Sequence, residues 1–319
     1  MYQLTDADIA ELADLCPDGL ARNVELSKMS WWRIGGRADL VVRPSTTLEV
    51  AAVMSWFNSR GIRPAVIGLT TNLLFDDAGL RVPCIQIGNR MANIEVQGER
   101  VRAEAGAWVP RLSRSLMKKG LGGAEHICGI PGTLGGLICM NGGSQRKCIA
   151  DHILSVESVD RAGAVRIHDT SDCGFAYRQS IFQTNDEIIT ASTMRYVPRP
   201  RDEVRREMCV ILGERRQKFP RKEPNCGSVF KSDPEMYAEI GSPGAIIERL
   251  GYKNRRVGGA CVSPKHANFI INTGNATALD VLELVREIKK AVRAATGYAM
   301  ETEARFLRAD GKILPACMD

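Results

Sequence analysis

Hydrophobic residues recur at helical spacing near the C-terminal end of the chain, within residues 276–297. Those that share one helical face are Val281, Val285, Ile288, Val292 and Ala295. Thr277 followed by Asp280 matches a capping box at the start of this segment, and Gly297 is placed to end it. The pattern therefore predicts an amphipathic helix with one buried face.

Strand and helix patterns alternate in the first half of the chain. Residues 46–61 predict a helix capped by Thr47, and residues 110–120 predict a helix with Pro110 in its first position. Short apolar runs predict strands at 63–69, 82–88 and 101–106. Strands that alternate with helices are typical of α/β units.

Further strands are predicted at 153–160, 164–169 and 187–197. Residues 198–204 then bring two prolines and a run of charges, which we interpret as a boundary between two parts of the chain. A helix from about residue 203 to 218 and a polar loop at 220–234 are predicted to follow. The second part of the chain therefore begins with a helix.

A final strand is predicted at 299–307, where polar and apolar residues alternate. If Met300, Ala304 and Phe306 face the core, Glu301 and Glu303 share the opposite face because they are two positions apart. A strand with two exposed carboxylates is the ordinary interpretation of this pattern.

Composition narrows the function classes. The chain has 319 residues, enough for two or three domains, and a formal net charge of +6. Its basic residues are scattered and only 6% of the residues are aromatic, so the basic stripe with interleaved aromatics that nucleic-acid binding favours is missing from the sequence. The mild positive charge suits an anionic small-molecule substrate, and we expect no nucleic-acid partner.

No apolar run reaches about 18 residues, and the N-terminus lacks the pattern of a signal peptide, so we expect no membrane association. None of the ten cysteines forms a CxxC pair, and the four histidines do not supply metal-ligand spacing. We therefore expect reduced cysteines, no metal site and a cytoplasmic location.

Two glycine-bearing segments are candidates for contact with phosphate: residues 66–79, and residues 130–143, which carry no charge. Neither matches the GxGxxG or GxxxxGK[ST] pattern, so a Rossmann or P-loop site is excluded. Each segment alone is about as consistent with a structural turn. As a pair they could hold a diphosphate through N–H groups and side-chain donors, from Thr70, Thr71, Asn72, Asn141, Gly142 and Gly143.

Four other polar segments carry weak signals. Arg178, within residues 174–182, is either a structural arginine or a two-pronged carboxylate ligand, and its surroundings alone favour the structural interpretation. The loop at 224–234, the glutamates near 301 and the segment 265–277 are each also consistent with ordinary surface structure.

These segments occur together in one familiar order, and the sequence resembles the UDP-N-acetylenolpyruvoylglucosamine reductases, in the compact subclass of that family. The resemblance spans residues from about 25 to 308 and rests on RIGGRADLVVRP, VIGLTTNLL, GIPGTLGGLICMNGG, YRQSIF, NCGSVFKSDP, GGACVSPKHANFIINTGNATALDV and ETEARF. It implies an α+β fold, with a two-part FAD-binding module of the vanillyl-alcohol-oxidase type followed by a smaller α+β substrate-binding domain.

The resemblance also implies domain limits. Residues 1–198 would form the FAD module, in two parts at about 20–80 and 81–198, and residues 199–319 the substrate domain. The strand near 300–308 would contribute to the active site. Noncovalent FAD would be held by Gly68, Thr70, Thr71, Asn72, Leu73, Ile130, Pro131, Gly132, Thr133, Gly135, Gly136 and Asn141.

For the family's reaction, NADPH supplies the hydride that reaches an enolpyruvyl double bond. The resemblance places Arg178 at the substrate carboxylate, Glu303 beside the same group, and Ser228 as the donor of the proton that completes the reduction. It implies a UDP-sugar substrate bound by Tyr177, Lys231, Lys265, His266 and Asn268. Oligomeric state is not fixed by the sequence, and we favour a monomer.

This chain departs from the family pattern at both flavin segments. Where the family has Gly-Gly-Gly-Ser-Asn, the chain reads Gly68-Leu69-Thr70-Thr71-Asn72, so that side chains replace two glycines. Asn141 is followed by Gly-Gly-Ser-Gln-Arg-Lys instead of Ala-Gly-Ala-Tyr-Gly. A divergent paralogue acting on another enolpyruvyl sugar nucleotide, and a flavin-binding protein without this activity, are the alternatives.

Overall fold

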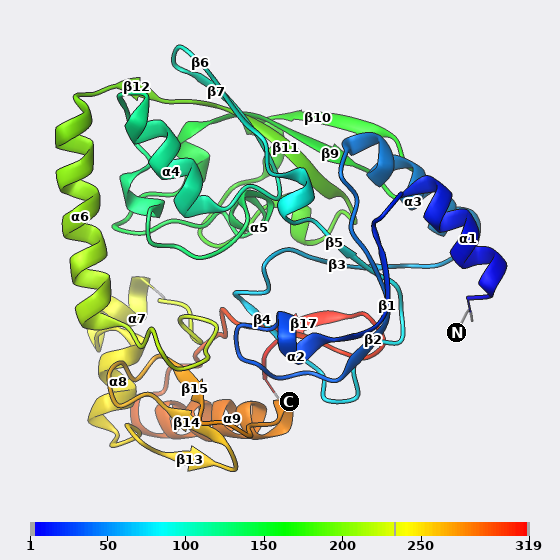
Figure 1. Ribbon diagram of the computed structural model, residues 1–319. Helices are drawn as coiled ribbons and strands as arrows, with labels where there is room; N and C mark the ends of the chain where they lie inside the picture. Colours follow the sequence, from blue (N-terminus) through cyan, green and yellow to red (C-terminus); the bar gives the residue numbers. More distant parts are fainter. Residues whose placement is uncertain (1–3, 233, 318–319) are drawn as a thin grey trace. The chain divides into compact units, whose positions relative to one another are not determined.

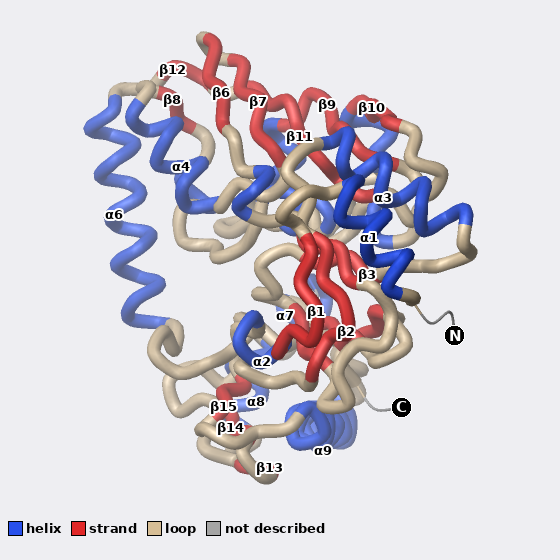
Figure 2. The backbone as a smooth tube through the Cα atoms, turned by 45° about the vertical axis from the view of Figure 1, so that its right-hand side comes forward, coloured by secondary structure: helices blue, strands red, loops and turns tan. Residues whose placement is uncertain are grey.

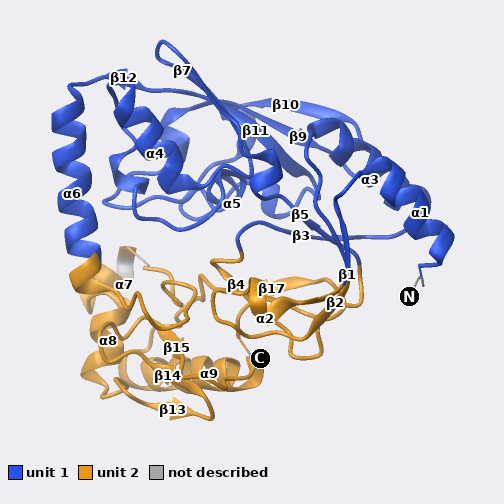
Figure 3. Ribbon diagram, in the orientation of Figure 1, with its two compact units in different colours: residues 1–22, 40–69, 83–215 blue, residues 23–39, 70–82, 216–319 orange. Residues whose placement is uncertain are grey.

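The computed structural model describes residues 4–232 and 234–317. The chain forms two compact units, coloured separately in Figure 3. Unit 1 comprises residues 1–22, 40–69 and 83–215, and unit 2 comprises residues 23–39, 70–82 and 216–319. Each unit is therefore assembled from segments that lie far apart in the sequence.

The larger sheet of unit 1 has the strand order β10-β9-β11-β7-β6, and every neighbouring pair is antiparallel (Figure 1). These strands are β10 (Val165–Asp169), β9 (Ile153–Val159), β11 (Ile188–Arg195), β7 (Arg100–Glu104) and β6 (Ile94–Gln97). A smaller sheet has the order β1-β2-β5-β3, in which β5 pairs in parallel with β2 and β3. Its strands are β1 (Leu20–Glu25), β2 (Arg37–Val42), β5 (Cys84–Gln86) and β3 (Ala65–Ile67).

Helices of unit 1 pack on these strands, as Figure 2 shows. The helix α3 (Thr47–Ser59) contacts β9, β11 and α1 (Asp6–Leu15), and α5 (Leu134–Cys139) contacts β11 and β7. The remaining elements are α4 (Val109–Lys118), α6 (Arg201–Lys218), the pair β8 (Leu121–Gly122) and β12 (Val197–Pro198), and the 3-10 helices η1 (Asn89–Met91), η2 (Glu125–Ile127), η3 (Ile149–His152), η4 (Thr170–Cys173) and η5 (Ile181–Gln183). The core they enclose includes the fully buried Phe57, Leu112, Ile138, Val156 and Met194.

Unit 2 contains two small sheets and a long helix. The antiparallel strands β13 (Arg256–Val257), β14 (Ala260–Val262) and β15 (Ile270–Asn272) form the first sheet, and α9 (Ala278–Thr296) packs against it and against α8 (Pro243–Arg249). In the second sheet, β16 (Arg305–Leu307) pairs in parallel with β4 (Leu73–Phe75) and antiparallel with β17 (Ile313–Pro315). Two short helices are α2 (Leu26–Met29) and α7 (Pro234–Glu239).

Buried hydrogen bonds attach an early segment of the chain to unit 2. The side chain of Trp32 is fully buried, and its Nε1 donates to the carbonyl of Ile270 at 2.8 Å. Asn272 Nδ2 donates in return to the Trp32 carbonyl at 2.9 Å. These bonds explain why residues 23–39 group with the C-terminal part of the chain.

The long helix predicted at 276–297 is confirmed as α9. Thr277 and Asp280 form both bonds of the capping box, and Gly297 adopts a left-handed conformation at the end of the helix. Four of the five residues on the predicted face are buried, but Ala295 is exposed. The last turn of α9 therefore extends beyond the core.

Several predicted boundaries differ from the structure. Thr46, not Thr47, caps α3, because Thr46 Oγ1 accepts from Glu49 N while Thr47 Oγ1 donates to Glu157 at 2.7 Å. Pro110 is the second residue of α4, which begins at Val109. Helix α1, which is weakly amphipathic, was not predicted. The strands that were not predicted are β1, β2, β4, β6, β8, β13 to β15 and β17, and most of them have only two or three residues.

The predicted strand at 299–307 is shorter in the structure, where only its last three residues are a strand. Met300 and Ala304 are buried as predicted, and the Glu301 side chain is 75% exposed. Glu303 is half-buried, so the two glutamates do not share an open face. The backbone between them bridges Thr302 to Phe230.

The compact units do not follow the predicted limit at residues 198 and 199. Val204, Met208 and Ile211 of α6 pack with Cys128 of unit 1, so most of α6 belongs to unit 1. The expected part at about 20–80 is divided, because β4 pairs with β16 in unit 2 while β3 pairs with β5 in unit 1. Within the described residues, no helix is both long and apolar enough to cross a membrane.

Candidate active site

The two glycine-bearing segments meet at Gly68 and Thr133 in unit 1. A Cβ atom on Gly68 would lie 2.5 Å from Thr133 Oγ1, which is closer than real Cβ contacts allow. The carbonyl of Gly68 is held by Gln86 Nε2 at 3.5 Å. The position needs glycine because the backbone after β3 runs directly against the threonine side chain.

The segment 130–143 contains a short helix, α5, where the sequence predicted a sharp turn. Thr133 caps this helix, and the N–H groups of Leu134 and Gly135 donate to the carbonyls of Ala107 and Ala105 at 2.9 and 2.7 Å. The first N–H groups of α5 are therefore satisfied within the protein. The glycine at 135 lets the start of the helix lie against the residues that follow β7.

Three N–H groups at the edges of these segments remain available. Those of Leu69, Gly132 and Thr133 donate to no acceptor in the part of the chain that the structure describes. Gly132 has a φ of +151°, which favours glycine. The hydroxyl of Thr133 accepts from Gly136 N at 3.3 Å and still has its own hydrogen to donate.

The side chain of Asn141 is hydrogen-bonded within unit 1, and its contact with FAD stays a prediction. Its Nδ2 donates to the carbonyl of Ala176 at 2.9 Å, and its Oδ1 accepts from Ala150 N at 3.3 Å. The side chain is buried, and the residue is left-handed with a φ of +40°. Asn141 therefore joins the end of the second segment to the turn that carries Arg178.

Arg178 occupies a tight turn in unit 1. Ala176 and Gln179 exchange both of their backbone hydrogen bonds, at 3.2 and 3.1 Å, so that Tyr177 and Arg178 form the two-residue tip. The Cζ of Arg178 lies 5.4 Å from the centre of the Tyr177 ring, and Tyr177 is 52% exposed. The tip presents an aromatic ring and a guanidinium group side by side.

The backbone of this tip is strained. Arg178 has a φ of +57° at the third position of the turn, where glycine is the usual residue. A side chain in the left-handed region costs roughly 1–2 kcal/mol. Such strain persists only where surrounding bonds enforce it, and it is concentrated at functional sites.

In unit 2, backbone hydrogen bonds join Val229, the residue after Ser228, to Glu303. The carbonyl of Val229 accepts from Glu303 N at 2.8 Å and from Ala304 N at 3.3 Å. Lys231 N donates to the Glu301 carbonyl at 3.0 Å. Ser228 and Glu303 are both half-buried. The two residues therefore come from adjacent, paired backbones.

Asn268 anchors the loop that carries Ser228. Its Oδ1 accepts from Phe230 N at 2.9 Å, its Nδ2 donates to Phe230 O at 3.0 Å, and its carbonyl accepts from Val229 N at 2.9 Å. The side chain is 5% exposed. Both ends of its side-chain amide therefore hold this loop, and substrate binding by Asn268 stays a prediction.

The first flavin segment reaches the same region of unit 2. Asn72 Nδ2 donates to the Glu303 carbonyl at 2.9 Å, and Arg305 N donates to the Asn72 carbonyl at 3.0 Å. Thr70 is buried and left-handed, with a φ of +59°, and its Oγ1 donates to the Met29 carbonyl at 2.7 Å. The side chain that replaces a family glycine is therefore anchored by its own hydroxyl.

The other predicted positions of the flavin segments lie along the same backbone stretches. Thr71 is half-buried, Leu73 begins β4, Ile130 packs against the core of unit 1, Pro131 is half-buried and Gly136 is exposed in α5. In the loop 224–234, Asp233 lies outside the described residues.

The predicted basic residues of unit 2 have intramolecular partners. Lys231 Nζ lies 2.8 Å from Glu301 Oε2. Lys265 is exposed, and its Nζ donates at 2.6 Å to the carbonyl of Arg216 near the end of α6. Both lysines keep additional N–H groups, because an ammonium has three donors.

His266 is neutral at pH 7, because its pKa lies well below the usual value. Burial first, and then the positive charges of Lys218 and Lys253, lower the pKa of His266 to about 4, although Glu248 acts in the opposite direction. Its Nδ1 accepts from Asn268 N at 3.2 Å, which places the proton of the neutral ring on Nε2. The ring packs near Phe269, at 5.0 Å between centres.

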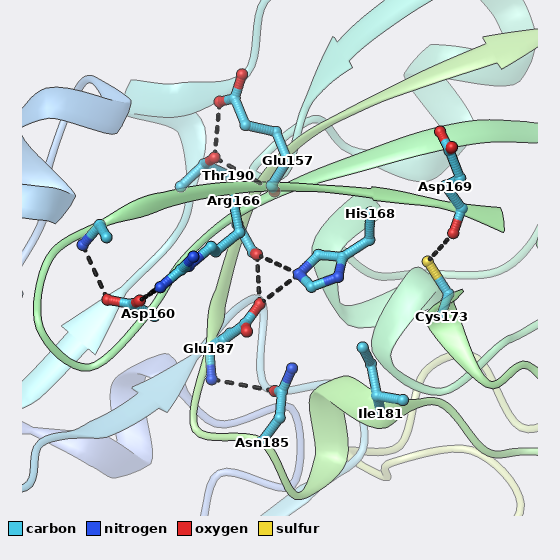
Figure 4. A network of polar contacts seen from close by, with 12 residues as sticks. Glu157, Asp160, Arg166, His168, Asp169, Cys173, Ile181, Asn185, Glu187 and Thr190 are labelled. Carbon is cyan, nitrogen blue, oxygen red and sulfur yellow. Dashed lines mark hydrogen bonds and ion pairs between the residues drawn. The ribbon is translucent and has the colours of Figure 1, made fainter. Parts of the chain in front are cut away.

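A separate polar network on the large sheet of unit 1, drawn in Figure 4, is structural. His168 Nε2 faces both Glu187 Oε2, at 2.7 Å, and Ser158 Oγ, at 3.2 Å. A catalytic triad would use opposite nitrogens of the ring, so this is not one. Among the described residues, no cluster of His, Cys, Asp or Glu could hold a metal ion.

A second member of the network shows how hydrogen bonds stabilise a carboxylate in the sheet. Burial alone would raise the pKa of Glu157, but hydrogen bonds from Thr47, Thr190 and Arg102 outweigh it and lower that pKa. The charged group is therefore satisfied where it lies, and the network contributes to the sheet instead of to a reaction.

Comparisons with known proteins agree with this arrangement. Residues 219–307 match the family model described as UDP-N-acetylenolpyruvoylglucosamine reductase, C-terminal domain, and residues 38–168 match that of an FAD binding domain. The UDP-N-acetylenolpyruvoylglucosamine reductase 1 of Corynebacterium glutamicum is 40% identical, with 93% of this chain and 88% of the relative covered. The reductase of Moorella thermoacetica is 37% identical, with 93% and 97% covered.

A solved structure is also similar. The crystal structure of UDP-N-acetylenolpyruvylglucosamine reductase from Thermus caldophilus superimposes with a TM-score of 0.76 at 29% identity, covering 89% of this chain and 97% of that one. Together with the FAD-domain match, this similarity confirms the predicted fold class, an α+β chain with an FAD-binding module.

The strain at Arg178 predicts an unusual order of stability. Because both substitutions remove the side chain, Arg178→Gly and Arg178→Ala differ chiefly in their tolerance of a positive φ. We expect Arg178→Gly to be about 1 kcal/mol more stable than Arg178→Ala, as measured by urea denaturation. At Tyr177, which is not left-handed, glycine should be no more stable than alanine. An Arg178→Ala variant as stable as Arg178→Gly would show that the turn is unstrained.

His266 predicts a defined pH dependence. Between its ordinary pKa of 6.5 and its folded value of about 4, the unfolded chain binds a proton that the folded chain does not. Stability from this residue is therefore complete above pH 6.5 and decreases as the pH falls toward 4. Urea midpoints of wild type and His266→Gln, measured from pH 7 to 4, should converge as the pH falls. A constant difference would contradict the neutral state of His266.

Proposed function

The chain belongs to the UDP-N-acetylenolpyruvoylglucosamine reductase family, and on that premise we propose how its own residues carry out the reaction. The protein is an FAD-dependent oxidoreductase that uses NADPH to reduce the enolpyruvyl group of UDP-N-acetylglucosamine enolpyruvate to UDP-N-acetylmuramate, a peptidoglycan precursor. The observation that best supports the roles below is the pairing of the Ser228 and Glu303 backbones through Val229.

The two segments around Gly68 and Thr133 have the properties that a bound FAD requires. A backbone without a Cβ at Gly68, and free N–H groups at Leu69, Gly132 and Thr133, offer donors to a diphosphate. Bound FAD would take up hydride from NADPH and pass it to the substrate. We expect the attachment to be noncovalent; Cys139, the one cysteine of these segments, directs its thiol to the Phe182 carbonyl.

Arg178 binds the substrate carboxylate in this proposal. Hydride addition to the terminal carbon of the enolpyruvyl group leaves negative charge on the carbon next to the carboxylate, and this charge spreads into the carboxylate oxygens. A planar guanidinium can bind both oxygens at once and stabilise that charge. Lysine would keep the positive charge but lose the two-pronged geometry. The strained turn fixes the backbone position from which the Arg178 side chain extends.

Ser228 donates the proton that completes the reduction. Its hydroxyl is half-buried on a loop whose neighbouring residues, Val229 and Phe230, are fixed by backbone bonds and by Asn268. A serine hydroxyl is a weak acid, so it suits a strongly basic carbanion. Lys231, three residues on, supplies a positive charge that favours proton loss from the hydroxyl.

Glu303 acts on the carboxylate of the enolpyruvyl group, the group that Arg178 binds. Burial first, and then the charge of Glu303, raise the pKa of Cys226 well above its usual range, so the Glu303 carboxyl lies close to this buried thiol. If it is protonated when substrate is bound, it can donate a hydrogen bond to the carboxylate that Arg178 holds. The Asn72 amide fixes the carbonyl of the same residue.

The UDP-sugar has further candidate contacts at Tyr177, Lys231 and Lys265, whose side chains are wholly or partly exposed. His266 would contribute a neutral Nε2–H donor in place of a charge. We propose that the protein works as a monomer in the cytoplasm. The ten free cysteines agree with a reducing compartment.

The role of Ser228 predicts a selective defect. Ser228→Ala should bind FAD and be reduced by NADPH at nearly the wild-type rate, because neither step needs this proton. Reoxidation by the enolpyruvyl substrate should slow by at least ~100-fold, as expected for loss of a positioned acid. Anaerobic stopped-flow absorbance at the flavin band separates the two half-reactions.

Ser232→Ala provides the control, because Ser232 is exposed on the same loop. It should behave as wild type in both half-reactions. If Ser228→Ala is reoxidised normally, the proton comes from another group, with Glu303 or a bound water as the next candidate.

A further inference from the structure

The strained turn of Arg178 is held by side chains that lie outside the reacting groups. Gln183, in η5, directs its amide toward this turn: Nε2 donates to the Arg178 carbonyl at 2.9 Å and to the Cys139 carbonyl at 2.9 Å. An amide nitrogen has two hydrogens, so both are used. Two carbonyl acceptors also fix which end of the amide carries the nitrogen.

The Cys139 carbonyl is a meeting point of two segments. It belongs to the last residue of α5, where helix carbonyls lack intrahelical partners. Ser180 Oγ donates to it at 2.7 Å in addition to Gln183. The end of the second flavin segment is therefore joined to the Arg178 turn through a single acceptor atom.

A second bond closes the same turn from its other side. Asn141 Nδ2 donates to the Ala176 carbonyl, so the residues on either side of the exposed tip are both attached to the end of α5. All of these groups belong to unit 1. Bonds on both sides of a left-handed residue are what a strained backbone needs in order to persist.

We infer that Gln183 is a positioning residue for Arg178: its amide fixes the Arg178 carbonyl to the end of α5 and thereby sets the direction of the guanidinium group. The inference rests on the proposed function, in which Arg178 binds the substrate carboxylate. Gln183 touches no reacting atom. Without the two N–H donors of Gln183, one side of the turn is no longer attached to α5. The backbone position of Arg178, from which its side chain extends, is then no longer fixed.

The test replaces Gln183 by methionine, which has a similar length and no N–H donor. Gln183→Met should bind FAD and be reduced by NADPH within about twofold of wild type. Reoxidation by the enolpyruvyl substrate should slow by roughly 10- to 100-fold, the usual effect of a misplaced binding group. Gln179→Met is the matched control, since this glutamine lies in the same turn with an exposed side chain and should retain wild-type rates.

A double-mutant cycle separates positioning from general support of the fold. If Gln183 acts through Arg178, then Gln183→Met should slow reoxidation by no more than about twofold in an Arg178→Ala background. An equal loss in both half-reactions, an undiminished effect in the Arg178→Ala background, or normal reoxidation of Gln183→Met would each overturn the inference. If the methionine variant does not fold, Gln183→Leu tests the same loss of donors without adding a charge.

Failure of the proposed function gives a different result. In that case wild type itself is not reoxidised by the substrate, or Arg178→Ala is reoxidised as fast as wild type. If both of these controls behave as proposed, the outcome for Gln183→Met bears on the positioning role alone.

Discussion

Buried backbone groups in loops must find hydrogen-bond partners, and in this protein side-chain amides supply them at every loop that carries a proposed catalytic residue. Gln183 holds the carbonyl of Arg178, Asn268 holds the N–H and carbonyl of Phe230 next to the Ser228 loop, and Asn72 holds the carbonyl of Glu303. A side-chain amide can donate and accept hydrogen bonds at once, so one such side chain can supply the partners that a neighbouring strand supplies in a sheet. The positions of the reacting groups therefore depend on residues that do no chemistry.

The amide anchors also explain how strain is tolerated. Arg178 and Thr70 occupy left-handed conformations that glycine would adopt without cost. Each is fixed by hydrogen bonds close by, through Gln183 for Arg178 and through its own hydroxyl for Thr70. A glycine at either place would relieve strain but would also let the loop move. Stability is given up locally for a defined geometry, as is common at sites of function.

The sequence predicted those parts of the molecule that follow from local pattern. The capped helix at Thr277 and four of the five strands of the large sheet, all but β6, follow from periodicity and end signals. The family resemblance identified the segments of the site. The sequence did not predict which polar side chains form hydrogen bonds within the protein. Asn141, Asn268 and His266 are suitable ligands by residue type, and only tertiary packing turns them inward. Gln183 directly follows the segment YRQSIF, but its amide also bonds to the carbonyl of Cys139, which is distant in the sequence and could not be predicted from it.

The proposed roles all require that this chain transfers hydride from NADPH to an enolpyruvyl UDP-sugar. The most direct measurement follows the flavin spectrum of the wild-type protein without oxygen. We expect one equivalent of NADPH to bleach the flavin absorbance and one equivalent of UDP-N-acetylglucosamine enolpyruvate to restore it, with UDP-N-acetylmuramate formed in the same amount. A flavin that stays reduced after addition of this substrate would show that the chain does not catalyse this reaction.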